Sequence, residues 1–241
     1  AGLQAFVERD RMTSSDHTAA RQRLVTDTDY ACLSTTELII EAVFEDMEIK
    51  KEVFRQLDEH APDGTILATN TSYLNTDEIA AVTSRPEDVI GLHFFSPAQL
   101  MRLLEIVKGE KTGSHVVATC LAFARRLDKV GVLAGVCDGF IGNRILFHYR
   151  KQVDYMLEDG AMPWEIDQAM ESFGMAMGPF RVMDQAGLDI GWANRQRLAP
   201  TRAQRERYVE IADRLCERGW FGRKSGRGLY CLLYTSDAAY E

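Results

Sequence analysis

The sequence predicts an α/β fold in which a domain built on a parallel sheet is followed by an all-α domain. Two observations predict it: short apolar runs alternate with helical patterns up to residue 138, and from residue 139 only helical patterns remain. Strands that alternate with helices are typical of parallel α/β units, whose ligands bind at the carboxyl ends of the strands. The 241 residues, 46% of them apolar, provide enough material for a large core.

The first part of the chain carries all the strand signals. Residues 1–31 contain no apolar strand run and predict helix. Beyond them, five apolar runs predict buried strands, at 37–43, 65–72, 88–97, 101–109 and 130–136. Segments with a helical period predict the intervening helices, at 45–64, 75–86 and 114–129. Pro62 and Gly64 end the first of these helices, and Asn75 or Thr76 caps the second.

The second part predicts four helices and a closing turn. The helices are expected at 140–160, 162–174, 180–198 and 202–219, and a glycine-rich turn at 221–230. Gly160 is the stop signal of the first helix. Residues 231–241 fit no expected element and are either a mobile tail or sequence from a wrong reading frame or cloning junction. We therefore expect domains at 1–138 and 139–230, followed by this tail.

Composition excludes several classes of protein. The formal net charge of −8 argues against wholesale nucleic-acid binding, and the longest apolar runs are too short to span a bilayer. The first residues show no signal-peptide pattern. The five cysteines include no C-x-x-C pair and fit neither a zinc site nor a disulfide framework, so no metal is expected. This cysteine usage predicts a cytoplasmic protein, with the peroxisomal or mitochondrial matrix as alternatives.

Positive charge is concentrated near the end of the chain. From Arg195 to Arg227 there are ten Lys and Arg residues against four Asp and Glu residues. Such a segment either meets phosphates or a neighbouring domain, or forms a solvated helix face.

Two ionisable residues stand inside apolar strand runs. His93 lies in Val-Ile-Gly-Leu-His-Phe-Phe, and Glu105 follows twelve residues later in Leu-Leu-Glu-Ile-Val. An ionisable group in an apolar strand costs free energy unless it is paired, and these two groups on nearby strands could satisfy each other. The pair either stabilises the core or acts as a carboxylate–imidazole general base.

Five motifs, in this order, resemble the L-3-hydroxyacyl-CoA dehydrogenases: IIEAVFEDMEIKKEVF, ILATNTS, GLHFFSPAQLMRLLEIVKGE, CDGFIGNRIL and GMAMGPFRVMDQAGLDIGWA. The later segments GLDIGWANRQR and IADRLCERGWFGRKSGRGLY look most like the dehydrogenase segment of multifunctional β-oxidation enzymes, which also carry an enoyl-CoA hydratase domain. The resemblance implies a Rossmann-type NAD-binding domain, a helical C-terminal dehydrogenase domain, and oxidation of (S)-3-hydroxyacyl-CoA to 3-oxoacyl-CoA with NAD. It also implies an acyl-CoA substrate, a fused or docked hydratase domain and a homodimer.

The same resemblance implies roles for individual residues. His93 matches the catalytic histidine of H-F-F-[NS]-P, and Glu105 its carboxylate partner. Ser72 matches a serine near the substrate hydroxyl and the nicotinamide, and Asn143 a polar residue that faces the substrate. The remaining matches lie on the cofactor side, and they are Glu45, Lys50, which also approaches CoA, and Ser96, which stands where many members have Asn. Without the resemblance, Ser72 is equally a turn cap, Asn143 an ordinary early-helix residue, and Glu45 with Lys50 a surface pair.

One feature of a dinucleotide-binding domain is missing from this sequence. No G-x-G-x-x-G occurs in the chain, which opens with AGLQAFVERD, a helical segment. We therefore expect an N-terminally truncated Rossmann-type domain that lacks its first βαβ phosphate-binding unit, in a fragment of a longer product that binds NAD weakly. The alternatives are an inactive fragment or non-catalytic relative of the same fold, or a related NAD-dependent hydroxy-acid dehydrogenase.

Overall fold

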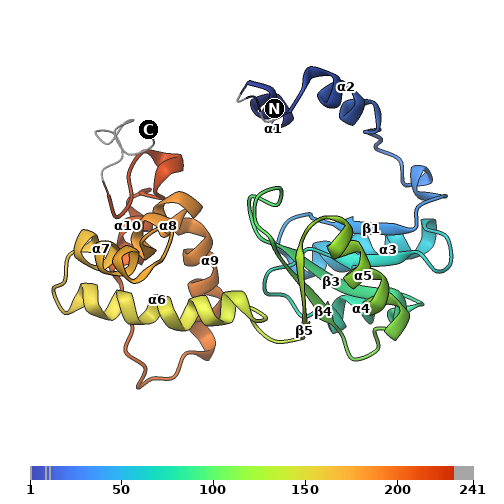
Figure 1. The fold of residues 1–241 in the computed structure, drawn as a ribbon. Helices are drawn as coiled ribbons and strands as arrows, with labels where there is room; N and C mark the ends of the chain where they lie inside the picture. The colour runs from blue at the N-terminus through green and yellow to red at the C-terminus, as the bar shows by residue number, and fades with distance from the viewer. Residues whose placement is uncertain (1, 9, 11, 231–241) are drawn as a thin grey trace. The chain divides into compact units, whose positions relative to one another are not determined.

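The structure is a computed structural model that describes residues 2–8, 10 and 12–230 (Figure 1). The tail expected at 231–241 lies outside these described residues. The chain divides into two compact units, Ala1–Gly142 and Asn143–Glu241, which we call the first and the second unit. Within the described ranges, every helix is too short or too polar to cross a lipid bilayer.

The first unit is built on a five-stranded sheet, so the α/β fold class is confirmed. The strands, in the order β1-β2-β3-β4-β5 across the sheet, are β1 (Leu38–Glu41), β2 (Ile66–Thr69), β3 (Val89–Phe94), β4 (Leu103–Lys108) and β5 (Val130–Gly135). Three of the four neighbouring pairs are parallel, but β3 and β4 run antiparallel, unlike the all-parallel expectation. The reason is the connection at 95–102, which contains no helix; parallel neighbours need a longer crossover, whereas antiparallel ones do not.

Helices and short 3-10 turns connect and cover these strands. They are α1 (Gly2–Glu8), α2 (Ser14–Gln22), η1 (Tyr30–Leu33), α3 (Met47–His60), α4 (Thr76–Ala80), η2 (Pro86–Asp88) and α5 (Ser114–Arg126). The helix expected over residues 1–31 forms only in part, as α1, α2 and the start of η1. Thr13 Oγ1 caps a new helix by accepting the Asp16 N–H, and the carboxylates of Asp27 and Asp29 accept nearby backbone N–H groups instead of allowing helix.

The two faces of the sheet are covered by different helices. Ala68, Ile90 and Leu104 point into a cluster with Val116 and Cys120 of α5. Their chain neighbours point the other way, because successive strand residues alternate between faces. Thus Leu67 and Val89 pack with Phe54 of α3 and Ile79 of α4, and His93 shares the face of Val89.

The described part of the second unit contains helices and one isolated bridge between Gly222 and Arg227, but no strand. Its elements are α6 (Gly142–Glu158, whose first residue belongs to the first unit), α7 (Pro163–Phe173), α8 (Pro179–Ala186), α9 (Leu188–Leu198), η3 (Ala199–Thr201), α10 (Ile211–Glu217) and η4 (Arg223–Ser225). The helix expected at 180–198 is broken in two because Gly187 adopts a φ of 102°. The helix expected at 202–219 forms only as α10, since Arg202 and Arg207 turn towards Tyr208 and Tyr155 instead.

Most basic side chains of the segment 195–227 contact carboxylates or aromatic rings within this unit. Carboxylates pair with Arg195, Arg207, Arg214 and Lys224, and aromatic rings lie beneath Arg202, Arg218 and Arg227. Many of these basic side chains therefore already have partners within the described part of this unit, which favours a solvated helix face over a phosphate site.

Candidate active site

Polar side chains gather where the parallel strands of the first unit end. Glu41 and Thr69 are the last residues of β1 and β2 and stand opposite each other in their parallel register. The segment Asn70–Thr71–Ser72 follows β2, and His93 is the penultimate residue of β3. The carboxyl end of a parallel sheet is where α/β proteins bind their ligands.

His93 and Glu105 form a buried pair. They are direct partners across β3 and β4, and Nδ1 of His93 lies 2.6 Å from Oε2 of Glu105. His93 is 4% exposed and Glu105 is fully buried. Because the carboxylate engages Nδ1, Nδ1 carries the ring proton when His93 is neutral, and Nε2 on the opposite side of the ring has a free lone pair. The ring is held by Phe95 and Phe140, at centroid distances of 4.5 and 5.8 Å.

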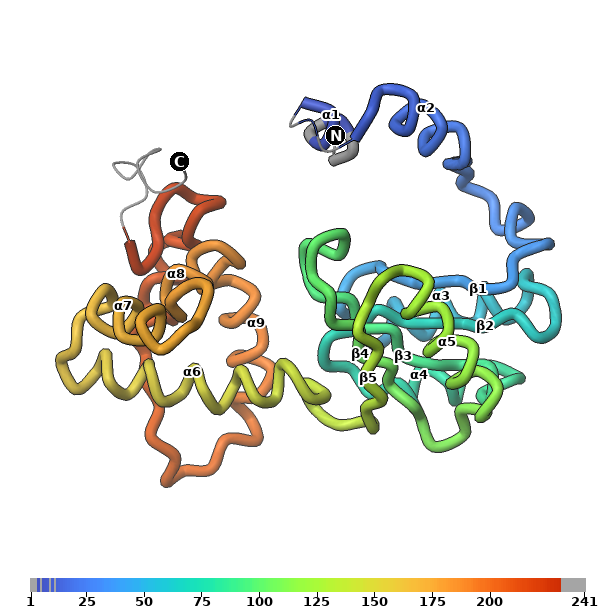
Figure 2. Tube along the Cα trace, viewed as in Figure 1, coloured from blue at the N-terminus to red at the C-terminus, as the bar shows by residue number. Residues whose placement is uncertain are grey.

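The second oxygen of Glu105 holds the start of α6. Oε1 accepts the N–H of Ile141 at 3.0 Å and that of Gly142 at 2.7 Å. The chain reaches this point from β5 through Gly139 and Phe140, which have φ angles of 72° and 47°. Figure 2 shows the chain running from β5 into α6. Burial would raise the pKa of the Glu105 carboxyl, but the hydrogen bonds from His93, Gly142 and Ile141 outweigh it and hold this pKa below its usual range. Glu105 is therefore an anion that accepts hydrogen bonds from three donors, the His93 ring and the Ile141 and Gly142 backbone.

Glu45 organises the turn that carries Ser72. Its Oε1 accepts the Thr71 hydroxyl at 2.7 Å, the Ser72 N–H at 2.7 Å and the Tyr73 N–H at 3.1 Å. Thr71 Oγ1 in turn accepts the Leu74 N–H at 2.9 Å. The turn is thus fixed by two side chains, and Ser72 itself is left partly exposed at the edge of the sheet.

Lys50 is not part of a surface pair, contrary to one interpretation of the sequence. It is 1% exposed, and its Nζ lies 2.7 Å from Oε1 of Glu41 and 3.5 Å from Oε2 of Glu45. Glu41 also accepts the Thr69 hydroxyl on Oε2 at 2.8 Å and the Val43 N–H on Oε1 at 2.6 Å. The sequence alone did not single out Glu41 and Thr69, although Glu41 lies inside the apolar run 37–43 and carries the same signal as Glu105.

Asn70 joins the two groups of residues. Its Oδ1 accepts the N–H of Phe94, the residue after His93, at 2.8 Å. This bond ties the segment after β2 to the end of β3, so the Ser72 turn and the His93 ring belong to one edge of one sheet. Asn70 was also missed, since a lone Asn after a strand is typical of an ordinary turn.

Ser96 and Asn143 are the other two residues singled out in the sequence. Ser96 is exposed, two residues beyond the end of β3, and makes no side-chain hydrogen bond within the described part of the chain. Asn143 is the second residue of α6 and the first of the second unit. It directly follows Gly142, whose N–H binds Glu105.

Apolar side chains are exposed directly after β1. Val43 and Phe44 are 41% and 82% exposed and precede Glu45, which holds the Ser72 turn. In the described residues, no group of three or more His, Cys, Asp or Glu side chains could hold a metal ion.

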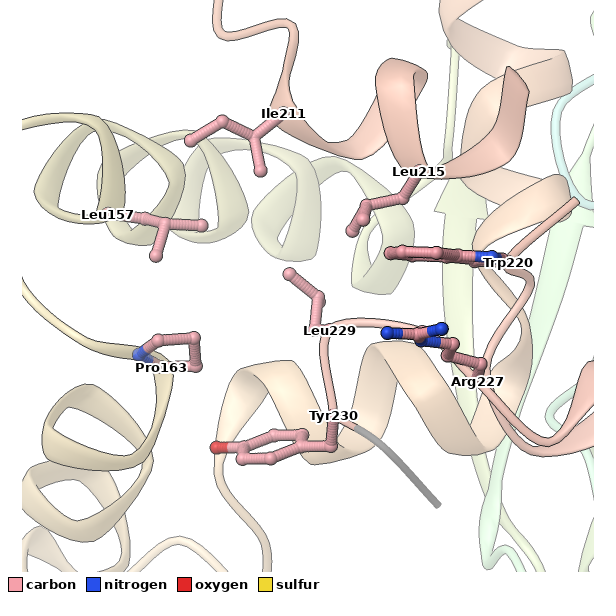
Figure 3. Close-up of a pocket in the computed structure, with 9 residues that line it drawn as sticks. Leu157, Pro163, Ile211, Leu215, Trp220, Arg227, Leu229 and Tyr230 are labelled. Atoms are coloured by element: carbon pink, nitrogen blue, oxygen red, sulfur yellow. The ribbon is translucent and has the colours of Figure 1, made fainter. Parts of the chain in front are cut away.

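The second unit contains a hollow of a different kind (Figure 3). Leu157, Leu215 and Leu229 line it together with Trp220, over whose ring the Arg227 guanidinium lies at 3.9 Å. None of the residues singled out in the sequence lines this hollow, and it offers no general base.

Two family models match the chain. One, described as "3-hydroxyacyl-CoA dehydrogenase, NAD binding domain", matches residues 1–137, and the other, described as "3-hydroxyacyl-CoA dehydrogenase, C-terminal domain", matches residues 139–231. These matches confirm the resemblance that the sequence motifs indicated.

The chain is similar to larger proteins and to a solved structure. It is 46% identical to the peroxisomal bifunctional enzyme of Danio rerio over 216 residues, which are 85% of this chain and 30% of the relative. It is 43% identical to that of Homo sapiens over 234 residues, 92% of this chain and 32% of the relative. The chain thus spans about a third of the length of these curated relatives. The solved 3-hydroxybutyryl-CoA dehydrogenase from Escherichia coli K12 has a TM-score of 0.89 and 34% identity, over 98% of this chain and 51% of that one.

Proposed function

The chain belongs to the 3-hydroxyacyl-CoA dehydrogenase family, and we propose that it oxidises (S)-3-hydroxyacyl-CoA to 3-oxoacyl-CoA with NAD, in fatty-acid β-oxidation. The observation that carries this proposal is the buried His93–Glu105 pair at the carboxyl edge of the sheet, whose 2.6 Å hydrogen bond leaves Nε2 of His93 as a base. Alcohol oxidation needs such a base, because the hydroxyl must lose its proton as the hydride leaves C3.

His93 is the general base in this proposal. Its Nε2 takes the proton of the substrate hydroxyl while the C–O single bond becomes a carbonyl. Glu105 keeps the proton of the neutral ring on Nδ1 and stabilises the imidazolium that forms, as a carboxylate does in a hydrolase triad. The burial of both side chains strengthens this electrostatic support, because little water screens it.

Ser72 and Asn143 would bind the substrate oxygen. A hydroxyl and a carboxamide can both donate hydrogen bonds where charge on that oxygen changes. Asn143 would come from the start of α6, whose backbone Glu105 holds. The carboxylate that orients the base therefore also fixes the chain next to Asn143.

NAD, when bound, supplies the hydride acceptor. Glu45, Lys50, Ser72 and Ser96 are the proposed cofactor-side residues. Glu45 is the best supported of them, because its side chain is 39% exposed next to Val43 and Phe44. Lys50 would not contact the cofactor directly, because its own ammonium is buried. It would instead influence the cofactor side by holding Glu45.

The relatives support part of what we propose about partners and compartment. We propose an acyl-CoA substrate, a fused or docked enoyl-CoA hydratase domain, and a homodimer. The relatives named as peroxisomal bifunctional enzymes support both the multifunctional setting and the peroxisomal alternative.

A substrate comparison tests the proposal. The chain is incubated with NAD and either (S)-3-hydroxybutyryl-CoA, its (R) isomer or free 3-hydroxybutyrate, and NADH absorbance is followed. We expect slow turnover, with the (S) thioester alone, in keeping with the weak NAD binding expected for this chain. Turnover of the free acid without turnover of the thioester would instead identify a hydroxy-acid dehydrogenase, and no turnover of any substrate would refute the activity for this chain.

A further inference from the structure

Glu41 has no role in the proposed chemistry, yet it is one of the most completely bonded carboxylates in the first unit. It is 4% exposed and accepts hydrogen bonds from Lys50, Thr69 and the Val43 backbone, all between 2.6 and 2.8 Å. A buried carboxylate that is satisfied on both oxygens is held rigidly. The hydrogen-bond partners of Glu41 therefore indicate which part of the structure this carboxylate holds in place.

One route leads from Glu41 through Lys50 to the Ser72 turn. The buried Lys50 ammonium is shared between Glu41 at 2.7 Å and Glu45 at 3.5 Å. Glu45 uses its other oxygen to hold the Ser72 and Tyr73 N–H groups. Because a buried ammonium is costly to leave unpaired, the position of Lys50 depends on both carboxylates, and loss of the Glu41 charge would shift the ammonium relative to Glu45.

A second route leads through Thr69 to the same turn. The Thr69 hydroxyl donates to Oε2 of Glu41, and this orients the lone pairs of Oγ1 towards the Thr71 N–H, 3.3 Å away. Thr71 is the residue before Ser72. Both routes start at Glu41 and converge on the residues 71–73.

We propose that Glu41 is a positioning residue for the Ser72 turn, acting through Lys50–Glu45 and through Thr69. This inference rests on the proposed function for the role of Ser72, but the geometric link does not depend on it. Lys50 and Glu45 then connect Glu41, at the end of β1, to the Ser72 turn. Glu41 affects the site by positioning this turn and does not contact a ligand itself.

The test combines amide exchange with kinetics in Glu41→Gln, which keeps the shape of the side chain and removes its charge. We expect faster hydrogen exchange at the Ser72 and Tyr73 amides, with the core amides of Leu67 and Ala68 unchanged. We also expect kcat to fall by about ten- to a hundredfold, since small misplacements of a reacting group cost this much, while KM for the acyl-CoA changes little. Glu48→Gln is the matched control, because it removes the same charge from an exposed side chain of α3.

Thr69→Val keeps the proposal testable if Glu41→Gln does not fold, because it is isosteric and leaves both charges in place. We expect a smaller effect in the same direction, and recovery in Thr69→Ser, which restores the hydroxyl. Unchanged exchange at Ser72 and Tyr73, or an equal acceleration at all amides, would overturn the proposal. Selective exchange without a fall in kcat would overturn its role in the reaction. In a chain without turnover, the proposed function fails, and the exchange pattern still decides whether Glu41 fixes the turn.

Discussion

His93 and Glu105 stand directly opposite each other on β3 and β4, and this pairing brings Nδ1 of the imidazole to 2.6 Å from Oε2 of the carboxylate. The antiparallel direction of these two strands is what allows residues only twelve positions apart to meet. A shift of the register by one residue would turn one of the side chains to the other face of the sheet. The register of β3 against β4 therefore determines whether the base has its partner.

Replacement of His93 by alanine should remove most of the turnover. A positioned general base contributes roughly 10²–10⁴-fold, so kcat for (S)-3-hydroxybutyryl-CoA should fall by about this factor. Binding of the acyl-CoA, measured by calorimetry, should survive, because His93 acts on one proton only. His115→Ala is the control, since that histidine is 69% exposed and lies beside Asp88, away from the sheet edge. Near wild-type turnover in His93→Ala would show that another group is the base.

Glu105→Gln should inactivate the base by changing its tautomer. The backbone donors Ile141 and Gly142 require an oxygen at the position of Oε1, so the carboxamide must turn its NH2 towards His93. Nδ1 then has to accept, and the proton of the neutral ring moves to Nε2, the atom that must take up the substrate proton. We expect a loss of kcat on the order of 10²–10⁴-fold with the fold retained.

The tautomer can be measured directly. Nitrogen NMR of the neutral His93 ring should report a proton on Nδ1 in the native chain and on Nε2 in Glu105→Gln, whether or not substrate is present. Glu110→Gln, which neutralises an exposed carboxylate just beyond β4, should leave both the tautomer and kcat unchanged. An unchanged tautomer in Glu105→Gln would contradict the argument even if activity fell.

The sequence predicted that His93 and Glu105 pair, because two charges in apolar strands are a strong signal, but it did not predict how the pair is bonded. The direction of β4 depends on a short connection whose turn no local pattern specifies. The two N–H donors to Glu105 come from Ile141 and Gly142, about 36 residues further along the chain. Only the tertiary fold brings them together.

Lys50→Met should strongly destabilise the first unit. The substitution leaves the Glu41 carboxylate buried without its cation, and breaking one side of a buried ion pair costs about 3–5 kcal/mol. The double variant Lys50→Met/Glu41→Gln should recover most of this loss, because no unpaired charge remains. Urea unfolding of the two single variants and the double variant measures the coupling between the residues.

Lys51 and Glu48 provide the matched control pair for this cycle. They lie on the same helix at 3.3 Å, but the Glu48 side chain is 79% exposed. Their coupling should stay below about 1 kcal/mol, as is usual for surface pairs. A coupling of similar size in the two cycles would mean that Lys50 and Glu41 are no more dependent on each other than surface charges.

The burial of Lys50 could not be predicted from its own helix alone. Its neighbours Lys51 and Glu48 also carry charges. The helical period of α3 alone therefore does not predict which lysine is buried and which is exposed. The distinguishing signal was Glu41, a charge inside the apolar run 37–43, whose burial requires a cation within reach. The run 37–43 and the helix after it, taken together, predict that Glu41 pairs with a lysine of that helix.

Asp154→Asn should stabilise the second unit, and only above a defined pH. Burial raises the pKa of the Asp154 carboxyl from 3.8 to about 6, and Asp213 adds to this, against the opposing effect of Arg150 and Arg195. The folded state therefore holds this proton at a higher pH than the unfolded state does, and stability falls as the pH rises from 3.8 to about 6. The asparagine variant avoids this loss, which amounts to at most about 3 kcal/mol.

Thermal unfolding across this pH range checks the sign as well as the size of the effect. The melting temperature of Asp154→Asn should match that of the native chain below pH 3.8 and exceed it increasingly up to about pH 6, above which the difference should stay constant. Asp159→Asn is the control with the opposite sign, because the hydrogen bond from Arg207 lowers the pKa of that exposed carboxyl, so its ionised form stabilises the fold. That variant should gain no stability at any pH. A pH-independent difference for Asp154→Asn would show that the substitution acts through packing rather than through the charge.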